Sequence, residues 1–264
     1  MSIRRTTGLF FVLAAVSFAV ASSILSATFD WPDILREPAP TVLSAFTAGG
    51  SSLVWTWFAT AWTYALLAVP MLLLPGALWH PSRVEHVLPR RRSALRTVTL
   101  VGAASVLLSL IGFLRWVFVV PPLARSWTSG SPTTRAAVEA AWTAQHQFGG
   151  ALLGEHLGQL LAIVWSVAVS VLALRGAVLP RWIGWTGLAA SALYLLNQGD
   201  VMSTALPGFP VWDAAGLVGS TAWGLWIASL GVALLLPYAA SSSSSPSSPS
   251  RRRAAGAGPA VALP

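Results

Sequence analysis

Long apolar runs separated by short polar segments fill most of this 264-residue chain. Each run holds roughly 20 or more residues, enough for a helix rising about 1.5 Å per residue to cross ~30 Å of hydrocarbon. The six runs lie at about residues 8–29, 52–75, 97–120, 149–174, 182–206 and 211–236. Backbone polar groups cannot stay unpaired in lipid, so the pattern predicts an all-α, polytopic transmembrane bundle of six helices.

The first run also has features of a signal peptide. It follows Arg4 and Arg5, and Ala19-Val20-Ala21 resembles a cleavage site. The apolar stretch nevertheless continues to Phe29, which is long enough to cross the membrane. We favour an uncleaved first span and keep cleavage as the alternative; the orientation of the later spans is the same in both cases.

The connection at 30–50 is long enough to hold structure of its own. Thr41 can cap a short helix that ends at Gly49-Gly50. The apolar side of this helix would carry Val42, Leu43 and Phe46. We expect the segment to lie over one end of the bundle.

A second structured connection is predicted at 121–150. Ser131 or Thr133 can cap an amphipathic helix that runs through Glu139 and His146 toward a break at Gly149-Gly150. Beyond the last span, residues 238–264 are rich in Ser, Pro and Arg, a composition typical of disorder. The chain is therefore expected to be one transmembrane domain, 1–237, followed by a disordered tail.

Arginines are distributed unequally between the two sides of this threading. Twelve fall on one side: Arg4, Arg5, Arg83, Arg90, Arg91, Arg92, Arg96, Arg175, Arg181, Arg251, Arg252 and Arg253. Three fall on the other: Arg36, Arg125 and Arg135. Because Arg-rich loops stay cytoplasmic, we predict that both termini are cytoplasmic and that the protein lies in the plasma membrane.

Tryptophans gather near the predicted membrane boundaries. Those near the outer ends are Trp55, Trp57, Trp116, Trp127, Trp142 and Trp212, and those near the inner ends are Trp79, Trp182 and Trp185. Amphipathic indoles favour the headgroup region, so we expect these residues to anchor the bundle in the lipid boundary.

Composition supports the membrane assignment and excludes several kinds of chemistry. The chain is 55% hydrophobic and only 9% charged, with a mean hydropathy of +0.68. Its net charge of +8 lies in the predicted cytoplasmic loops and tail, so we interpret it as a topology signal and expect no nucleic-acid partner. The chain has no Cys, which excludes disulfides, thiolate metal sites and a Cys nucleophile.

Three charged residues are predicted at a similar depth near the outer ends of the spans. Arg115 lies about five residues before the end of the third span, and Glu155 lies about five residues inside the fourth. Asp200 in the fifth span reaches a similar depth. Ionised groups in hydrocarbon are costly unless they are paired or hydrated. We therefore expect Arg115 to pair with Glu155 or Asp200.

The fourth span carries a polar stripe beside a stripe of small residues. Gly150, Gly154 and Gly158 recur every fourth residue, a spacing that permits close helix packing. A pocket facing outward would then be lined by Arg115, Glu155, His156, Gln159, Asn197, Gln198 and Asp200. The alternatives are an arginine that extends toward the headgroups and an ion pair that only fixes helix register.

Metal and hydrolase chemistry have weak support. His146 and His156 lie ten residues apart, which matches no usual ligand spacing, and His80, Glu85 and His86 lie among arginines that are typical of a solvated surface. Gly219-Ser220 lacks the Gly-x-Ser-x-Gly pattern of a serine hydrolase. We expect no metal, no other cofactor and no assigned catalytic residue.

Three stretches resemble a bacterial multi-pass membrane family, the domain of unknown function 4386. They are Phe29-Asp30-Trp31-Pro32-Asp33-Ile34-Leu35-Arg36, Arg115-Trp116-Val117-Phe118-Val119-Val120-Pro121 and Gly154-Glu155-His156-Leu157-Gly158-Gln159-Leu160. The resemblance covers residues 1–237 and implies a six-helix bundle of unknown activity. It assigns no catalytic residues.

The sequence leaves three hypotheses for function. The first is a non-enzymatic membrane protein that binds a small molecule or ion in the outward polar pocket, as a sensor or transport accessory. The second is an intramembrane enzyme that uses Glu155 or His156 as a general base on a lipid-derived substrate. The third is an assembly or regulatory protein that binds a membrane partner through the glycine stripe and the basic cytoplasmic loop.

Overall fold

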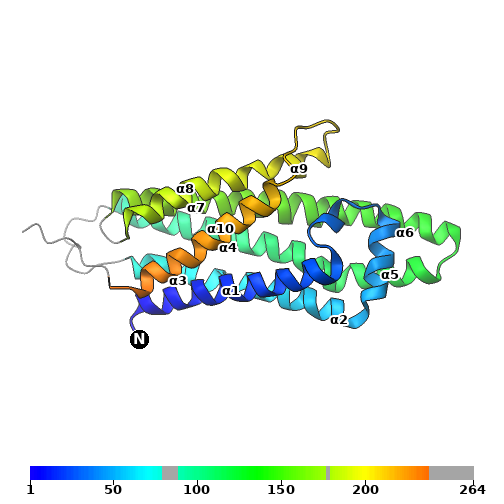
Figure 1. The fold of residues 1–264 in the computed structure, drawn as a ribbon, viewed down its shortest axis with the longest axis horizontal. Helices are drawn as coiled ribbons and strands as arrows, with labels where there is room; N and C mark the ends of the chain where they lie inside the picture. Colours follow the sequence, from blue (N-terminus) through cyan, green and yellow to red (C-terminus); the bar gives the residue numbers. More distant parts are fainter. Residues whose placement is uncertain (79–88, 177–178, 238–264) are drawn as a thin grey trace, which may run out of the picture.

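A computed structural model describes residues 1–78, 89–176 and 179–237 of the chain. The structure is 86% helical, with no strand in these ranges, and its helices form six rods along one axis (Figure 1). The predicted all-α, six-helix architecture is confirmed. The tail at 238–264 and the group His80, Glu85 and His86 lie outside the described residues.

The six rods follow one another along the chain. The first is α1 (Ile3–Phe29), and the second comprises α2 (Ala39–Ala65) and α3 (Ala68–Ala77). The third comprises α4 (Pro89–Phe118) and α5 (Val120–Ser129), and the fourth comprises α6 (Pro132–Gln145), η3 (His146–Gly158) and α7 (Gln159–Arg175). The fifth comprises α8 (Arg181–Leu196) and α9 (Gln198–Ser203), and the last is α10 (Ala215–Leu235). A 3-10 turn, η1 (Asp33–Arg36), joins the first two rods.

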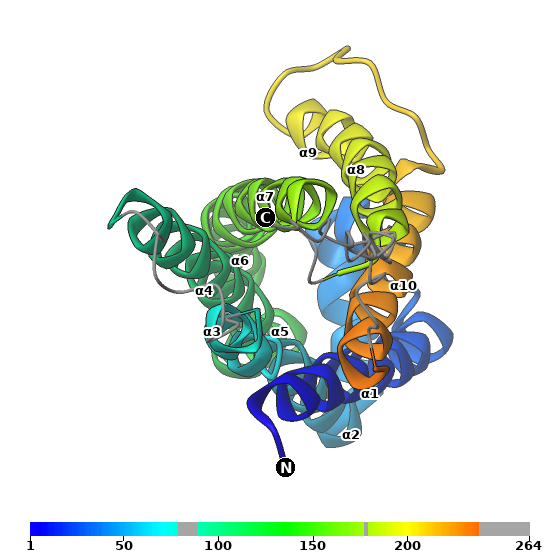
Figure 2. The same cartoon turned by 90° about the vertical axis from the view of Figure 1, so that its left-hand side faces the viewer.

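The rods pack in chain order around a ring, which α1 and α10 close (Figure 2). These two helices cross at Gly8 and Gly231, where a Cβ on Gly8 would lie 2.6 Å from the Gly231 carbonyl oxygen. Arg4 of α1 donates hydrogen bonds to the carbonyl oxygens of Ala233 and Leu234 in α10. The two glycines therefore allow the first and last helices to come into backbone contact.

The two ends of the bundle differ in structure (Figure 1). We call the end where α1 begins and α10 finishes the proximal end, and the end that carries η1, α5, α6 and α9 the distal end. The beginning of α1 and the end of α10 lie together, as an even number of crossings requires. The distal end corresponds to the predicted outer side.

Five of the rods contain helices long and apolar enough to cross a membrane. Helix α8 has 16 residues and completes the six-rod bundle. Large apolar side chains are exposed along the outside of the rods; on α1 they are Leu9, Leu13, Val16, Val20 and Ile24. Apolar surface of this extent is typical of contact with lipid, and the chain is a multi-pass membrane protein.

Aromatic rings dominate the core at the distal end. Trp57 and Trp116 stack with ring centroids 4.6 Å apart, and Phe29 packs edge-on against both rings. Trp142 packs against Trp116 from α6. Trp57, Trp116 and Trp142 are buried in protein, so the prediction that they anchor the bundle in the headgroup boundary is wrong for these three.

The first part of α2 lies across the end of the bundle, as the sequence predicts (Figure 1). Val42, Leu43 and Phe46 are buried, and the helix turns at Gly50, whose φ of 58° is easily adopted only by glycine. The predicted N-cap is wrong, because the helix begins at Ala39 after Pro38 and not after Thr41. Ser131 caps α6 as predicted, accepting from the Thr134 amide.

The fourth rod is one continuous helix over Pro132–Arg175. The expected break at Gly149-Gly150 is therefore wrong; η3 instead continues the rod as a π-helix, with hydrogen bonds from residue i to i+5. A helix of this length reaches well beyond ~30 Å of hydrocarbon, so α6 extends past the membrane with α5 beside it.

The fifth rod is interrupted where the sequence predicts one span over 182–206. Helix α8 ends at Leu196, and α9 starts again at Gln198. The turn between them directs the amide side chains of Asn197 and Gln198 toward the fourth rod, where both bond to Gln159. The interruption therefore brings polar groups to the distal end.

Candidate functional site

Helices α4 and η3 come into close contact along the predicted glycine stripe. A Cβ on Gly154 would lie 3.2 Å from the Cα of Gly112, and a Cβ on Gly158 would lie 2.5 Å from the hydroxyl of Ser109. Gly150 faces the guanidinium group of Arg115. The stripe thus meets Ser109, Gly112 and Arg115, which recur every third residue on α4.

The three glycines of the stripe lie on the π-helix η3 and contact one partner helix. An α-helix has 3.6 residues per turn, so residues four apart drift around its axis. In a π-helix the drift is of similar size and opposite direction, so in either geometry a four-residue repeat keeps the glycines on one broad face. π-turns within longer helices are also frequent at functional sites, and η3 carries His146, Glu155 and His156.

Arg115 is buried between α4 and η3, with only 8% of its surface exposed. Its Nη1 donates to the carbonyl oxygen of Gly112 at 2.9 Å, and its Cζ lies 5.2 Å from the centre of the Trp116 ring. The guanidinium lies so close to Gly150 that a Cβ there would be 2.6 Å from Cζ. A glycine at position 150 is therefore needed for this placement of Arg115.

The carboxylates are paired by Arg36 and not, as the sequence analysis expects, by Arg115. Arg36 Nη2 lies 2.6 Å from Glu155 Oε2 and 2.7 Å from Asp200 Oδ2. Arg36 Nε also donates to both oxygens of Asp200 at 3.1 Å. The expected partner differs because Arg115 lies level with Gly150, roughly one turn from Glu155, whereas η1 brings Arg36 directly above Glu155.

The charge of Arg36 is strongly stabilised. Burial lowers the pKa of its guanidinium, but the nearby Glu155 and Asp200 carboxylates outweigh this effect and raise the pKa above its ordinary value. The three side chains remain 28%, 21% and 33% exposed for Arg36, Glu155 and Asp200. Arg36 thus stays charged, and its two ion pairs are partly exposed at the distal side.

The loop that carries Arg36 is folded back onto the bundle. Asp30 ends α1 in a left-handed conformation with a φ of 51°, and its carbonyl oxygen accepts from the Ile34 amide at 2.9 Å. The Ile34 side chain is buried in the distal core. These contacts hold η1 over the end of the fourth rod, where Arg36 reaches both carboxylates.

Four polar side chains form a separate amide network between the fourth and fifth rods. Gln159 Nε2 donates to the Tyr194 carbonyl oxygen at 2.8 Å, and Gln159 Oε1 accepts from Asn197 at 3.2 Å and from Gln198 at 2.6 Å. Gln198 Oε1 lies 2.6 Å from His156 Nδ1. Since an amide oxygen only accepts, His156 Nδ1 carries the proton. The network satisfies the Gln159 and Gln198 amides and ties the two rods together.

The predicted pocket residues therefore separate into two groups at one end of the bundle. Gln159, Asn197, Gln198 and His156 hold the rods together through hydrogen bonds. Glu155, Asp200 and Arg115 carry charge, and Arg36 joins them from the loop. We refer to Arg36, Arg115, Glu155 and Asp200 as the charged cluster.

Several buried polar atoms beside the charged cluster have no hydrogen-bond partner within the described ranges. They are Nε and Nη2 of Arg115, Oε1 of Glu155 and Nδ1 of His146. The ring of His146 stacks on Trp142 with centroids 5.1 Å apart and lies within electrostatic reach of Arg36, Arg115 and Glu155. The region around the charged cluster therefore contains unused donors on Arg115 and an unused acceptor on Glu155.

Arg36 and His146 are the site residues that the predicted pocket lacks. Helix rise predicts the depth of Arg115 and Glu155 in the bundle, but it cannot predict the position of a residue in a loop. Charge balance offers a usable signal, because Glu155 and Asp200 outnumber Arg115 and require another cation from the outer side. Arg36, Arg125 and Arg135 are the three candidates, and Arg36 is the one in a short, proline-bounded loop.

Metal binding has no support from the arrangement of side chains. No group of three or more His, Asp or Glu residues that could hold a metal ion occurs in the described part of the chain. The Nδ1 atom of His156 is occupied by Gln198, and His146 lies against Trp142. The two histidines that the sequence singles out are therefore directed to different neighbours.

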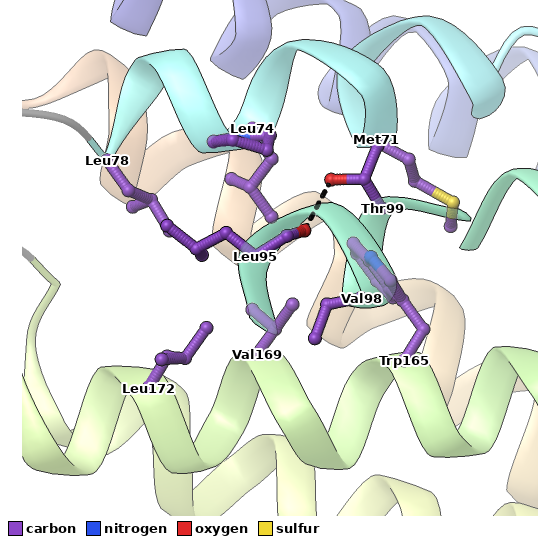
Figure 3. Close-up of a pocket in the computed structure, with 10 residues that line it drawn as sticks. Met71, Leu74, Leu78, Leu95, Val98, Thr99, Trp165, Val169 and Leu172 are labelled. Carbon is purple, nitrogen blue, oxygen red and sulfur yellow. Dashed lines mark hydrogen bonds between the residues drawn. The ribbon is translucent and has the colours of Figure 1, made fainter. Parts of the chain in front are cut away.

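A pocket of a different kind lies nearer the proximal end, between α3, α4 and α7 (Figure 3). Its lining is almost entirely apolar and includes Met71, Leu74, Val98 and Trp165. The hydroxyl of Thr99 donates to the Leu95 carbonyl oxygen at 2.9 Å, as the dashed line in Figure 3 shows. No charged group lines this pocket, so the charged cluster is the stronger candidate site for a polar ligand.

Comparisons with known proteins give a family without a known activity. The family model described as domain of unknown function DUF4386 matches residues 6–231. Neither the curated proteins nor the solved structures contain a match to the chain. The matched range includes most or all of each of the six rods and the whole charged cluster. The chain therefore belongs to the DUF4386 family of unknown function.

Proposed function

We propose that the protein binds a small polar molecule or ion at the charged cluster, as a sensor or transport accessory of the plasma membrane. The observation that carries the proposal is the unused hydrogen-bonding capacity of Arg115, which is buried and whose Nε and Nη2 atoms have no hydrogen-bond partner among the described residues. An unsatisfied buried donor costs about 1–3 kcal/mol, so such groups call for a specific reason. A ligand that accepts hydrogen bonds from Arg115 would explain why these donors are left without a protein partner in the described ranges.

Two further features support ligand binding at this end. The carboxylates of Glu155 and Asp200 are partly exposed, which gives a route from the distal side. Ionisable groups at membrane depth commonly mark substrate or ion sites. In a purely structural ion pair, the donors of Arg115 would instead bind the carboxylate of Glu155.

The test is the thermal unfolding of the purified protein with a panel of small molecules. The panel contains simple anions and cations, sugars, amino acids and phosphorylated compounds. A compound that binds only the folded state raises the unfolding temperature. We expect at least one compound to do so for the wild-type chain and to lose its effect in Glu155→Gln.

The matched control is Glu139→Gln, which removes a carboxylate from α6 outside the charged cluster. This variant should respond to the same compound as the wild type does. If no compound stabilises the wild type, and Glu155→Gln only lowers the unfolding temperature, the cluster is a structural support and the proposal is wrong. The enzyme and membrane-partner hypotheses stay predictions.

A further inference from the structure

The unused atoms beside the charged cluster specify the chemistry of a ligand. On Arg115, the atoms Nε and Nη2 form one edge of the guanidinium group and have no partner in the described part of the chain, whereas Nη1 donates to the Gly112 carbonyl oxygen. That edge presents two parallel N–H donors, the geometry that binds two oxygens of a carboxylate or phosphate. One end of the ligand is therefore an oxyanion.

The second requirement comes from Glu155. Its Oε2 is held by Arg36 at 2.6 Å, and its Oε1 is buried and unpartnered within the described residues. A carboxylate oxygen only accepts hydrogen bonds, so the ligand must bring a donor to this position. The oxyanion and the donor must be close together on one small molecule, because Arg115 and Glu155 are roughly one helical turn apart.

Charge balance then decides which donor is suitable. The charged cluster contains two arginines and two carboxylates, so it is already neutral overall. Adding an uncompensated charge to a poorly hydrated site is costly. A ligand that brings an oxyanion to Arg115 must therefore also bring a positive group, and an ammonium with N–H bonds both donates to Glu155 and balances the charge.

We infer that the charged cluster binds a small zwitterion in which Arg115 holds the oxyanion and Glu155 holds an ammonium group with N–H bonds. This inference rests on the proposed ligand-binding function and specifies its ligand class. Free amino acids, glycerophosphoethanolamine and the headgroup of phosphatidylethanolamine share this chemistry, because each carries one negative oxyanion and one ammonium group. Analogues in which the nitrogen carries three methyl groups keep both charges but lose the N–H donors.

The experiment compares matched pairs on the full chain in phosphatidylcholine nanodiscs. Thermal unfolding is measured with glycerophosphoethanolamine against glycerophosphocholine, and with alanine against trimethylated alanine. Nanodiscs with phosphatidylethanolamine test the lipid headgroup as the source. We expect a rise of about 5 °C from at least one N–H-bearing member at saturation, and at least tenfold weaker binding of its methylated partner.

Two variants connect the effect to the cluster. Arg115→Lys keeps the positive charge but loses the two-donor edge, and it should weaken the binding of the zwitterion at least tenfold. Arg125→Lys makes the same change at an exposed position of α5 and should leave binding unchanged. Because the comparison of methylated and unmethylated compounds uses the wild-type chain, it stands even if Arg115→Lys fails to fold.

The outcomes separate this inference from the proposed function. If simple phosphate or a simple cation stabilises the wild type as well as any zwitterion does, a ligand site exists but the zwitterion inference is wrong. Equal effects of methylated and unmethylated compounds also overturn the inference. If no compound or lipid changes the unfolding temperature, both the inference and the proposed function fail.

Discussion

Arg36 satisfies two carboxylates from different rods, whereas the more deeply buried Arg115 keeps one hydrogen bond to a backbone carbonyl oxygen. The contrast follows from geometry. The loop between α1 and α2 can adapt until its arginine reaches Glu155 and Asp200, but Arg115 is fixed by the register of α4 against η3. Arg36 therefore ties the loop to two rods, whereas Nε and Nη2 of Arg115 have no hydrogen-bond partner among the described residues.

Replacing Arg36 should release the loop and leave both carboxylates without a cation. For Arg36→Gln we expect the free energy of unfolding to fall by about 1–3 kcal/mol, because charge-assisted hydrogen bonds at partly exposed side chains are lost. Chemical unfolding of the purified protein in detergent measures the change.

The control for this prediction is Arg125→Gln on α5. Arg125 is exposed, and its side chain makes no ion pair with any described residue, so we expect a change within about 0.5 kcal/mol. Equal losses in the two variants would show that the ion pairs of Arg36 contribute no specific stability.

At this scale, sequence reasoning locates Glu155 and Asp200 at the distal end but assigns them the wrong partner. Helix rise gives depth with an error of about a turn, and a turn is enough to place Arg115 beside Gly150 instead of Glu155. The position of Arg36 depends on Asp30, Ile34 and the distal core, which are contacts between distant parts of the chain. Local pattern carries no information on such contacts.

Among the secondary-structure elements, the π-helix η3 and its contact with α4 determine how the site is built. Glycines on both helices allow the backbones to approach, and Arg115 lies over the one at position 150. The interruption at Asn197 supplies amides that fix the opposite side of η3. Two irregular elements thus define the position of Glu155 on both sides.

Gly112→Ala should separate α4 from η3. A Cβ at this position would lie 2.9 Å from the Cα of Gly154, which is backbone and cannot move away alone. We expect overpacking to cost about 1–3 kcal/mol, even though alanine favours a helix. The unfolding temperature of the purified variant measures this loss.

Gly224→Ala on α10 is the matched comparison, because a Cβ there would meet nothing within 4 Å. This variant should be as stable as the wild type or up to about 1 kcal/mol more stable, through helix propensity alone. An equal effect of the two substitutions would contradict the close contact between α4 and η3.

At the element scale, apolar runs and glycine signals predict much of the structure. The turn at Gly50 and the Ser131 cap follow from local chemistry and are confirmed. Local chemistry does not predict whether the helix is continuous near residues 149 and 197. Gly149-Gly150 reads as a break but lies inside a continuous helix, and Asn197 lies inside an apolar run but ends α8. Tertiary packing overrides local propensity at both positions.

For the whole molecule, the ring of six rods puts both ends of the described chain at the proximal end and the charged cluster at the distal end. Hydropathy is sufficient to predict the number of rods. It does not predict that α1 packs against α10, because the Gly8–Gly231 contact joins residues far apart in the sequence. The arginine distribution adds a predicted orientation, with the distal end outside.

Thiol labelling tests this orientation. The chain has no cysteine, so Thr133→Cys at the start of α6 and Pro237→Cys after α10 each introduce one thiol at an exposed position. A maleimide that cannot cross membranes should label Thr133→Cys on intact cells and Pro237→Cys only after permeabilisation. The reverse pattern would show that the arginine distribution predicts the wrong topology.

The stability of Arg115→Met without added ligand shows whether Arg115 serves a ligand and not the fold. Methionine fills similar space and removes two unsatisfied donors. If Arg115 serves a ligand, the free energy of unfolding changes by no more than about 1 kcal/mol, because the loss of unsatisfied buried donors, which cost about 1–3 kcal/mol, offsets the lost bond to Gly112 and the lost charge balance with Glu155. A loss of about 3–5 kcal/mol, typical of a broken buried ion pair, would contradict it.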